Sequence, residues 1–223
     1  DSEILESLPS PTDRRVEFIR ESLVELDVAL RQRGGGLIVR HAWASSEIPR
    51  LASELGVRAV FANRDYEPQA KARDAKVAAA LATHGIGFEL FKDQVVFDGP
   101  EVLTQTGRAY TVFTPYRNSW LKRLSDDDLA VHTGESGRLI ETSSASGVPS
   151  LEDIGFRPSN LPQLGIVPGL KGARLLVDDF RQRIRRYREQ RDYPAVKGVS
   201  YLSVHLRFGT ISIRDLVSIA CAE

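Results

Sequence analysis

Apolar side chains recur every three or four positions over residues 16–30 and predict a long amphipathic helix. Its apolar face carries Val16, Ile19, Leu23, Leu26 and Leu30, the spacing at which side chains share one helix face. The glycines at 34–36 predict the end of this helix, because glycine accepts the left-handed conformation of a C-cap. Two further helices are predicted over 48–55 and 68–83.

Short apolar runs separate these helices, at residues 37–39, 59–62, 88–91 and 95–97. Such uniformly apolar runs are typical of strands buried in a parallel sheet. Strand and helix therefore alternate, which is the sequence form of βαβ crossovers and predicts a doubly wound parallel sheet over residues 15–112. Because this order opens with a helix, we expect a further strand of the sheet to lie upstream of Asp1.

The second half of the chain has a different character. Residues 125–172 are rich in Ser, Thr, Pro and Gly with weak periodicity, and the stretch 143–147 predicts a long surface linker. Helical periodicity returns on a face that carries Ala173, Leu176, Phe180 and Ile184, and another helix starts near Ser212. A pair of helices is too small for an independent domain, so we expect the chain to be part of a longer protein.

Composition places the chain among soluble globular proteins, with 42% hydrophobic and 27% charged residues in 223. The 30 basic and 30 acidic side chains balance, so net charge indicates no nucleic-acid or membrane partner, although a local basic patch stays compatible with it. The single cysteine, Cys221, excludes an intrachain disulfide. No apolar run is long enough for a bilayer, and we expect a cytoplasmic, monomeric protein without a membrane partner.

Several common chemistries have no sequence signature here. The chain contains no glycine-rich phosphate loop and no GxSxG nucleophile motif. The four histidines are His41, His84, His132 and His205, and they show no metal-ligand spacing. With one cysteine besides, we expect no metal site, and no residue is singled out as catalytic.

The most informative motif lies near the carboxyl end, where Gly198 to Ser203 form a polar bend. Backbone N–H groups and hydroxyls in such a bend beside a helix start can hold a phosphate or pyrophosphate. Tyr187 and Arg191 are one helical turn apart and can present a phenol ring and a guanidinium to one ligand. The alternative is a Ser-capped helix–turn–helix with a surface Arg–Asp pair, which composition alone favours.

Two other segments have both a functional and a structural interpretation. The loop from Asn63 to Pro68 follows an apolar run, at the end of a parallel sheet where ligands bind, but it also suits a helix start. Thr114 and Pro115 predict a helix start as N-cap and first residue. Aromatic side chains after it share one helix face, which is either near a chromophore or, more commonly, in the core.

Together these segments resemble the class I DNA photolyase and cryptochrome family. The matching segments, in order, are Asn63–Pro68, Arg73–Asp74, Lys92–Phe97, Phe113–Lys122 and Tyr187–Arg214. The resemblance implies an α/β antenna domain over 1–124, an interdomain linker over 125–172 and the beginning of an all-helical FAD-binding domain over 173–223. It also implies that the chain is truncated at both ends.

The resemblance assigns roles to particular residues. It implies that FAD is contacted by Tyr187 and wrapped by the run Val199, Ser200, Tyr201, Leu202 and Ser203. It also implies that Arg191 faces a DNA phosphate at the lesion. The first position of that run is usually threonine, so Val199 lacks a hydroxyl and one flavin contact must come from the backbone or water.

The activity implied by the resemblance is light-driven repair of cyclobutane pyrimidine dimers in DNA by reduced FAD, a carbon–carbon lyase reaction. The alternative is a cryptochrome-type blue-light photoreceptor that repairs nothing. Arg108 stands where folate-using relatives carry a glutamate and cannot accept a hydrogen bond from a pterin. A folate antenna is therefore not expected, while a deazaflavin, another antenna chromophore or none stays open. We expect the 223-residue chain alone to be inactive and to retain little FAD.

Overall fold

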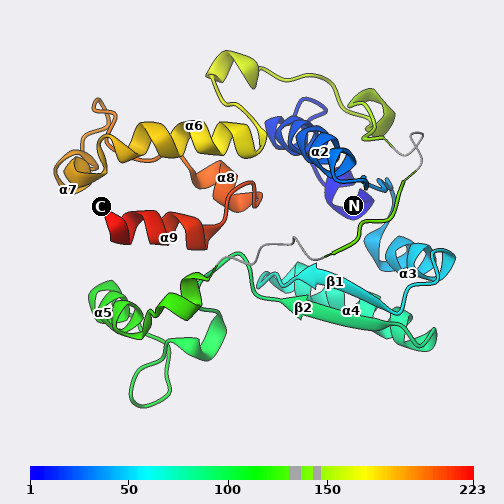
Figure 1. Ribbon diagram of the computed structural model, residues 1–223, viewed down its shortest axis with the longest axis horizontal. Helices are drawn as coiled ribbons and strands as arrows, with labels where there is room; N and C mark the ends of the chain where they lie inside the picture. The colour runs from blue at the N-terminus through cyan, green and yellow to red at the C-terminus, as the bar shows by residue number, and fades with distance from the viewer. Residues whose placement is uncertain (131–136, 143–146) are drawn as a thin grey trace.

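The computed structural model describes residues 1–130, 137–142 and 147–223. Strands β1 (Ala59–Asn63) and β2 (Gly87–Phe91) pair in parallel, with Ala59 opposite Gly87 and Asn63 opposite Phe91. Helix α4 (Pro68–Thr83) connects them, so β1, α4 and β2 form one βαβ unit (Figure 1). The predicted α/β class with a parallel sheet is confirmed, and within the described ranges the sheet has two strands.

The core of this α/β part lies between one face of the sheet and two helices, α4 and α3 (Ala44–Glu54). Alternate strand residues point toward the helices, so Val60 and Phe88 pack on buried side chains there. The buried members of that cluster are Ala52, Val77, Leu81 and Ile86. Phe61 and Phe91 point to the opposite face, where their rings lie 6.0 Å apart and stay exposed.

Two of the predicted strands are not strands. A strand needs a hydrogen-bonded neighbour, and residues 37–39 pair with no strand in the part of the chain that the structure describes. Instead, the Leu37 N–H donates to Asp27 Oδ1 at 2.7 Å. This bond, with the Arg31 guanidinium, lowers the pKa of Asp27. Residues 95–97 form bends that bury Val96 and Phe97 in a second cluster, so the apolar pattern predicted burial but not conformation.

Helix α2 (Arg14–Gln32) precedes the sheet in sequence but packs on helices α6 (Gly169–Arg181) and α8 (Ser203–Arg207). The buried Phe18 ring meets His205 edge-on at 5.2 Å and lies 5.5 Å from Phe208. Gly169 has φ +76°, a left-handed conformation that favours glycine, and its N–H donates to Ser22 Oγ of α2 at 3.0 Å. Glycine at this position therefore suits the contact between α2 and the start of α6.

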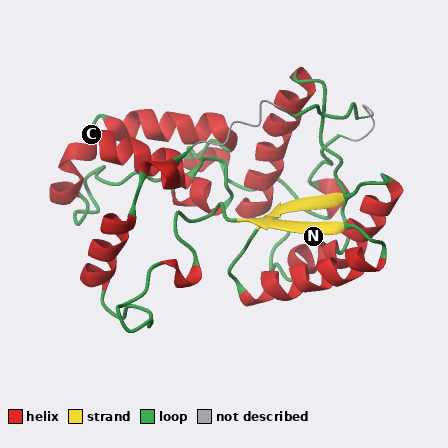
Figure 2. Cartoon of the chain, turned by 60° about the horizontal axis from the view of Figure 1, so that its bottom comes forward, coloured by secondary structure: helices red, strands yellow, loops and turns green. Residues whose placement is uncertain are grey.

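The described part of the linker after residue 146 runs along α2 (Figure 2), with short 3-10 turns at Glu152–Ile154 and Pro162–Leu164. Arg14 Nε donates to Asn160 Oδ1 at 2.7 Å, and the Ser159 N–H donates to Glu17 Oε2 at 2.8 Å. This half of the linker is therefore anchored to the first long helix. Ser143 to Ser146, from the predicted serine-rich stretch, lie outside the described residues.

The remaining helices refine the predicted boundaries. They are α1 (Ser2–Glu6), α5 (Phe113–Arg123), α7 (Tyr187–Gln190) and α9 (Ile213–Ala222). Helix α5 begins before Thr114 with Val112 as its N-cap, so Thr114 does not cap it as predicted. Helix α6 ends at Arg181, and Ile184 falls in a 3-10 turn rather than on its face. None of the helices in the described ranges is long and apolar enough to cross a membrane.

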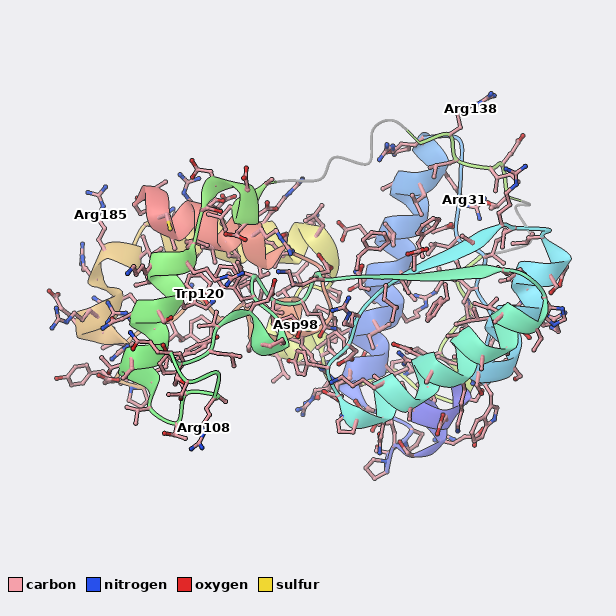
Figure 3. The ribbon with its side chains drawn as sticks, turned by 90° about the horizontal axis from the view of Figure 1, so that it is seen from below. Arg31, Asp98, Arg108, Trp120, Arg138 and Arg185 are labelled. Atoms are coloured by element: carbon pink, nitrogen blue, oxygen red, sulfur yellow. The ribbon has the colours of Figure 1, made fainter. Side chains whose placement is uncertain are left out.

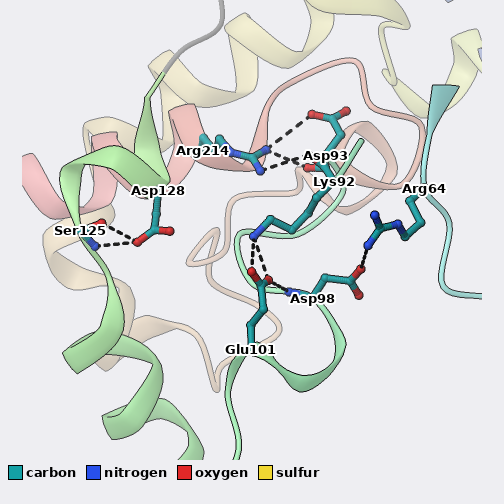
Figure 4. Close-up of polar contacts among 8 residues, drawn as sticks. All are labelled: Arg64, Lys92, Asp93, Asp98, Glu101, Ser125, Asp128 and Arg214. Carbon is teal, nitrogen blue, oxygen red and sulfur yellow. Dashed lines mark hydrogen bonds and ion pairs between the residues drawn. The ribbon is translucent and has the colours of Figure 1, made fainter. Parts of the chain in front are cut away.

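Helix α9 joins the two halves of the molecule through Arg214, whose side chain is largely buried. Its guanidinium donates to the carbonyls of Lys92 and Asp93, directly after β2, at 3.3 and 3.2 Å (Figure 4). Lys92 in turn contacts Glu101 at 2.8 Å. The Asp98 N–H and the Lys92 ammonium lower the pKa of Glu101. The segment after the sheet is thus fixed to the C-terminal helix.

We predict that Phe18→Ala lowers the free energy of unfolding by about 3–5 kcal/mol, because it opens a cavity between α2 and α8. Phe113→Ala, at a 72% exposed ring, should change it by less than about 0.5 kcal/mol. Urea unfolding followed by circular dichroism measures both. Equal effects of the two substitutions would show that the Phe18 contact does not hold the helices together.

Candidate functional site

The bend at 198–203 lies on the surface beside α7. A Cβ on the buried Gly198 would lie 2.7 Å from the backbone of Gln190, so only glycine allows this approach. Tyr201 has φ +58° and is the sole non-glycine residue with positive φ in the described ranges. Its side chain is exposed, whereas Leu202 is 3% exposed. The bend is therefore anchored at Gly198 and Leu202 and presents the residues between them outward.

The polar groups of the bend suit an anionic or polyhydroxyl ligand. The Ser200 hydroxyl receives only a long contact, 3.4 Å from the Leu202 N–H. Ser203, at the first position of α8, is exposed. The carbonyl of Val199, by contrast, already accepts from Arg183 Nη2 at 2.9 Å. The serine hydroxyls are thus available for a ligand, while the Val199 carbonyl holds the bend in place.

Tyr187 and Arg191 lie together, as their spacing predicts. The Arg191 N–H donates to the Tyr187 carbonyl at 2.9 Å, and the guanidinium carbon lies 5.7 Å from the ring centroid. The Tyr187 ring also meets Phe180 edge-on at 6.0 Å and stays partly exposed. The surface Arg191–Asp192 pair of the structural alternative is present too, at 3.6 Å. Such exposed pairs contribute little to stability, and Arg191 remains accessible.

Sequence reasoning missed the side chains that hold this surface together. Asp179 accepts from Lys197 Nζ at 3.0 Å and from Arg183 Nη1 at 2.5 Å. These two cations lower the pKa of Asp179. The i, i+4 spacing of Asp179 and Arg183 was a readable signal. The contacts by which Lys197 and Arg183 converge on Asp179 beside the bend are tertiary, and no local sequence pattern indicates them.

His205 fixes α8 from below the bend. Its side chain is fully buried, and Nδ1 lies 2.7 Å from Thr210 Oγ1. Burial lowers the pKa of His205, since the charged imidazolium loses its hydration, and the Gly169 backbone opposes that shift. A Cβ on Gly172 would lie 1.7 Å from the Val167 carbonyl and 3.1 Å from His205 Cε1. Tight packing therefore keeps this ring neutral and in place.

The second predicted site segment, Asn63 to Pro68, is largely paired. Asn63 donates to Asp93 Oδ2 at 2.8 Å, and Arg64 lies 3.3 Å from Asp98. Glu67 stands at the N-cap position of α4, and its side chain pairs with Arg207 of α8 at 2.9 Å. A cavity of about 480 Å³ beside this loop is lined by charges of both signs. The segment thus serves as a helix start, and its role toward a ligand stays a prediction.

Arg108 lies in a tight loop closed by two hydrogen bonds with Thr104, at 2.8 and 3.0 Å. Figure 3 shows its side chain at the tip of that loop, pointing away from the body of the molecule. An exposed cation in this place offers no acceptor to a pterin ring.

Comparisons with known proteins identify relatives of this fold. A family model described as DNA photolyase matches residues 4–134. A deoxyribodipyrimidine photo-lyase of Halobacterium salinarum is 35% identical over 100% of this chain and 46% of its own length. The crystal structure of a class III photolyase from Agrobacterium tumefaciens aligns with a TM-score of 0.81 and 25% identity, covering 96% of this chain and 45% of that chain.

A second solved structure is the archaeal photolyase from Sulfolobus tokodaii, crystallised with two FAD molecules. It aligns with a TM-score of 0.67 and 26% identity, covering 97% of this chain and 46% of that chain. The chain therefore spans about half the length of the curated photo-lyases that it matches over nearly all of its own residues.

We predict that stability falls as the pH drops below the ordinary histidine pKa of 6.5. The folded state holds His205 neutral, so the unfolded state binds the proton first and gains up to about 1.4 kcal/mol per pH unit. His205→Asn, whose amide replaces Nδ1, should remove that part of the pH dependence. Urea unfolding at pH 7.5 and 5.5 compares the two proteins. The same pH dependence in both would show that His205 is not the group responsible.

Proposed function

Because the chain belongs to the DNA photolyase family, we propose that it is part of a flavoenzyme that uses light to repair cyclobutane pyrimidine dimers in DNA. The observation that carries this proposal is the exposed bend at 198–203 beside the Tyr187 ring. An aromatic ring, two serine hydroxyls and a backbone anchored at both ends match the parts of a dinucleotide. The photo-lyase names of its relatives support the reaction class.

The residues present fit FAD as the cofactor. In this proposal Ser200 and Ser203 bind the phosphates and ribityl chain with nearby backbone N–H groups, and Tyr187 contacts the cofactor with its ring. Val199, Tyr201 and Leu202 shape the same bend. When bound, reduced FAD supplies the light-driven electron transfer that no side chain of this chain can perform. The chain's own part is to hold and orient the cofactor.

Arg191 is the proposed contact to DNA. Its guanidinium is exposed and lies against Tyr187, so a phosphate bound there would be next to the proposed flavin surface. A lesion acted on by this site must leave the duplex, because the target atoms are covered inside the base stack. A positive charge at the rim holds the backbone while the dimer leaves the stack.

The finer assignments stay proposals. We propose an antenna domain over 1–124, a linker over 125–172 and a flavin-binding domain that begins at 173. With Arg108 in place of an acceptor, a deazaflavin or another chromophore suits the antenna better than a folate. A monomeric, cytoplasmic protein remains the prediction.

We predict that Arg191→Ala, in the protein at its full natural length, weakens binding of dimer-containing DNA about 10- to 150-fold. A lost charge-assisted hydrogen bond of about 1.5–3 kcal/mol corresponds to this range. The flavin content should not change. Arg138→Ala is the matched control. Arg185 lies just before α7, close in sequence to Arg191, and Arg138 lies at the opposite end of the molecule from Arg185 (Figure 3). Electrophoretic mobility shifts measure the affinity, and unchanged binding would remove the assignment of Arg191.

A repair assay under blue light distinguishes a photolyase from a photoreceptor that repairs nothing. We expect the flavin-loaded protein at its full natural length to restore the absorbance of an oligonucleotide that carries a thymine dimer, in light and not in darkness. Absorption at 260 nm follows the reaction. If flavin binds and reduces normally but no dimer is split, the cryptochrome-type photoreceptor becomes the correct function.

A further inference from the structure

Arg183 occupies an unusual position between the end of α6 and the bend at 198–203. Its side chain is only 14% exposed. Nη2 donates to the Val199 carbonyl at 2.9 Å, and Nη1 donates to the Asp179 carbonyl at 2.7 Å. One guanidinium thus ties Val199, near the start of the bend, to the last turn of α6.

The Arg183 guanidinium also contacts the aromatic rings of the site, Phe180 and, through it, Tyr187. Its central carbon lies 5.4 Å from the centroid of the Phe180 ring, and Phe180 meets the Tyr187 ring at an interplanar angle of 89°. Val199 belongs to the bend and Tyr187 begins α7, so the two residues come from the two parts of the proposed flavin surface. Arg183 contacts one of them directly and the other through a single ring.

Stability alone does not explain an arginine here. Its Nε is buried and has no hydrogen-bond partner among residues 1–130, 137–142 and 147–223. An unpaired buried donor costs free energy. Asp179 balances the charge but is shared with Lys197. A buried cation with an unpaired N–H calls for a role beyond stabilising the fold. The forked guanidinium of arginine can bind a carbonyl and a carboxylate at once, so it can hold two segments at a fixed spacing.

We infer that Arg183 is a positioning residue that sets the spacing between the bend at 198–203 and the Tyr187 ring. This inference rests on the proposed function, because the surface that it organises is the proposed flavin site. Lysine keeps the charge but has one ammonium group, which cannot make both bonds and stack on Phe180. Arg183→Lys therefore tests geometry separately from charge.

Amide hydrogen exchange of the 223-residue chain measures the positioning without any flavin. Arg183→Gln should raise exchange at residues 199–203 about tenfold, as expected for one lost hydrogen bond. Arg183→Lys should raise it by a smaller factor. Arg181→Lys is the matched control, because Arg181 pairs with Glu223 alone among the described residues, at 3.2 Å. Exchange at Val77 and Leu81, in the distant α/β core, reports whether the fold stays intact.

Unchanged exchange at 199–203 in both Arg183 variants would overturn the inference. If Arg183→Gln raises exchange at Val77 and Leu81 too, it has unfolded the chain, and Arg183→Lys alone decides. FAD titration of the protein at its full natural length then tests whether the position of the bend affects cofactor binding. We expect the Kd for FAD to be about tenfold higher in Arg183→Lys. Failure of the unsubstituted protein to bind FAD would refute the proposed function while leaving the exchange result valid. Normal FAD affinity in Arg183→Lys would refute the inference alone.

Discussion

The contact between Phe18 and His205 is the constraint on which the rest of this structure depends. It joins the first long helix, α2, to the short helix α8 that begins at the bend. Gly172 lets the backbone approach closely enough for the ring to be enclosed. The buried, neutral histidine fixes the bend by packing, and the Arg183 bond to the Val199 carbonyl also fixes it. The exposed residues of the bend are therefore presented on a rigid base.

Two ion-paired contacts place this helical half against the sheet. Arg214 binds the backbone after β2, and Arg207 pairs with Glu67 after β1. Both contacts lie at the carboxyl ends of parallel strands, the end at which α/β sheets bind ligands. The proposed flavin surface and the loop at 63–68 are therefore connected through α8 and α9, which fixes the position of one relative to the other.

The sequence predicted the elements whose signals are local. The helices at 16–30 and 68–83 and the strands at 59–62 and 88–91 follow from apolar periodicity, and the Tyr187–Arg191 pairing follows from helical spacing. The strand at 37–39 was wrong because a strand depends on a neighbour, which apolar pattern does not specify. The Phe18–His205 contact and the Arg183–Val199 bond join residues far apart in sequence, and no local pattern indicates them. The residues of the candidate site were thus proposed from the sequence, and that assignment stays a prediction. The contacts that hold these residues in place had no local signal.

The most direct test is a hydrogen-exchange footprint of FAD on the protein at its full natural length. The account predicts that FAD slows exchange at residues 199–203 and at Tyr187 relative to the protein stripped of flavin. Protection confined to the loop at 63–68, with exchange in the bend unchanged, would show that flavin binds at the carboxyl end of the sheet and would contradict the account.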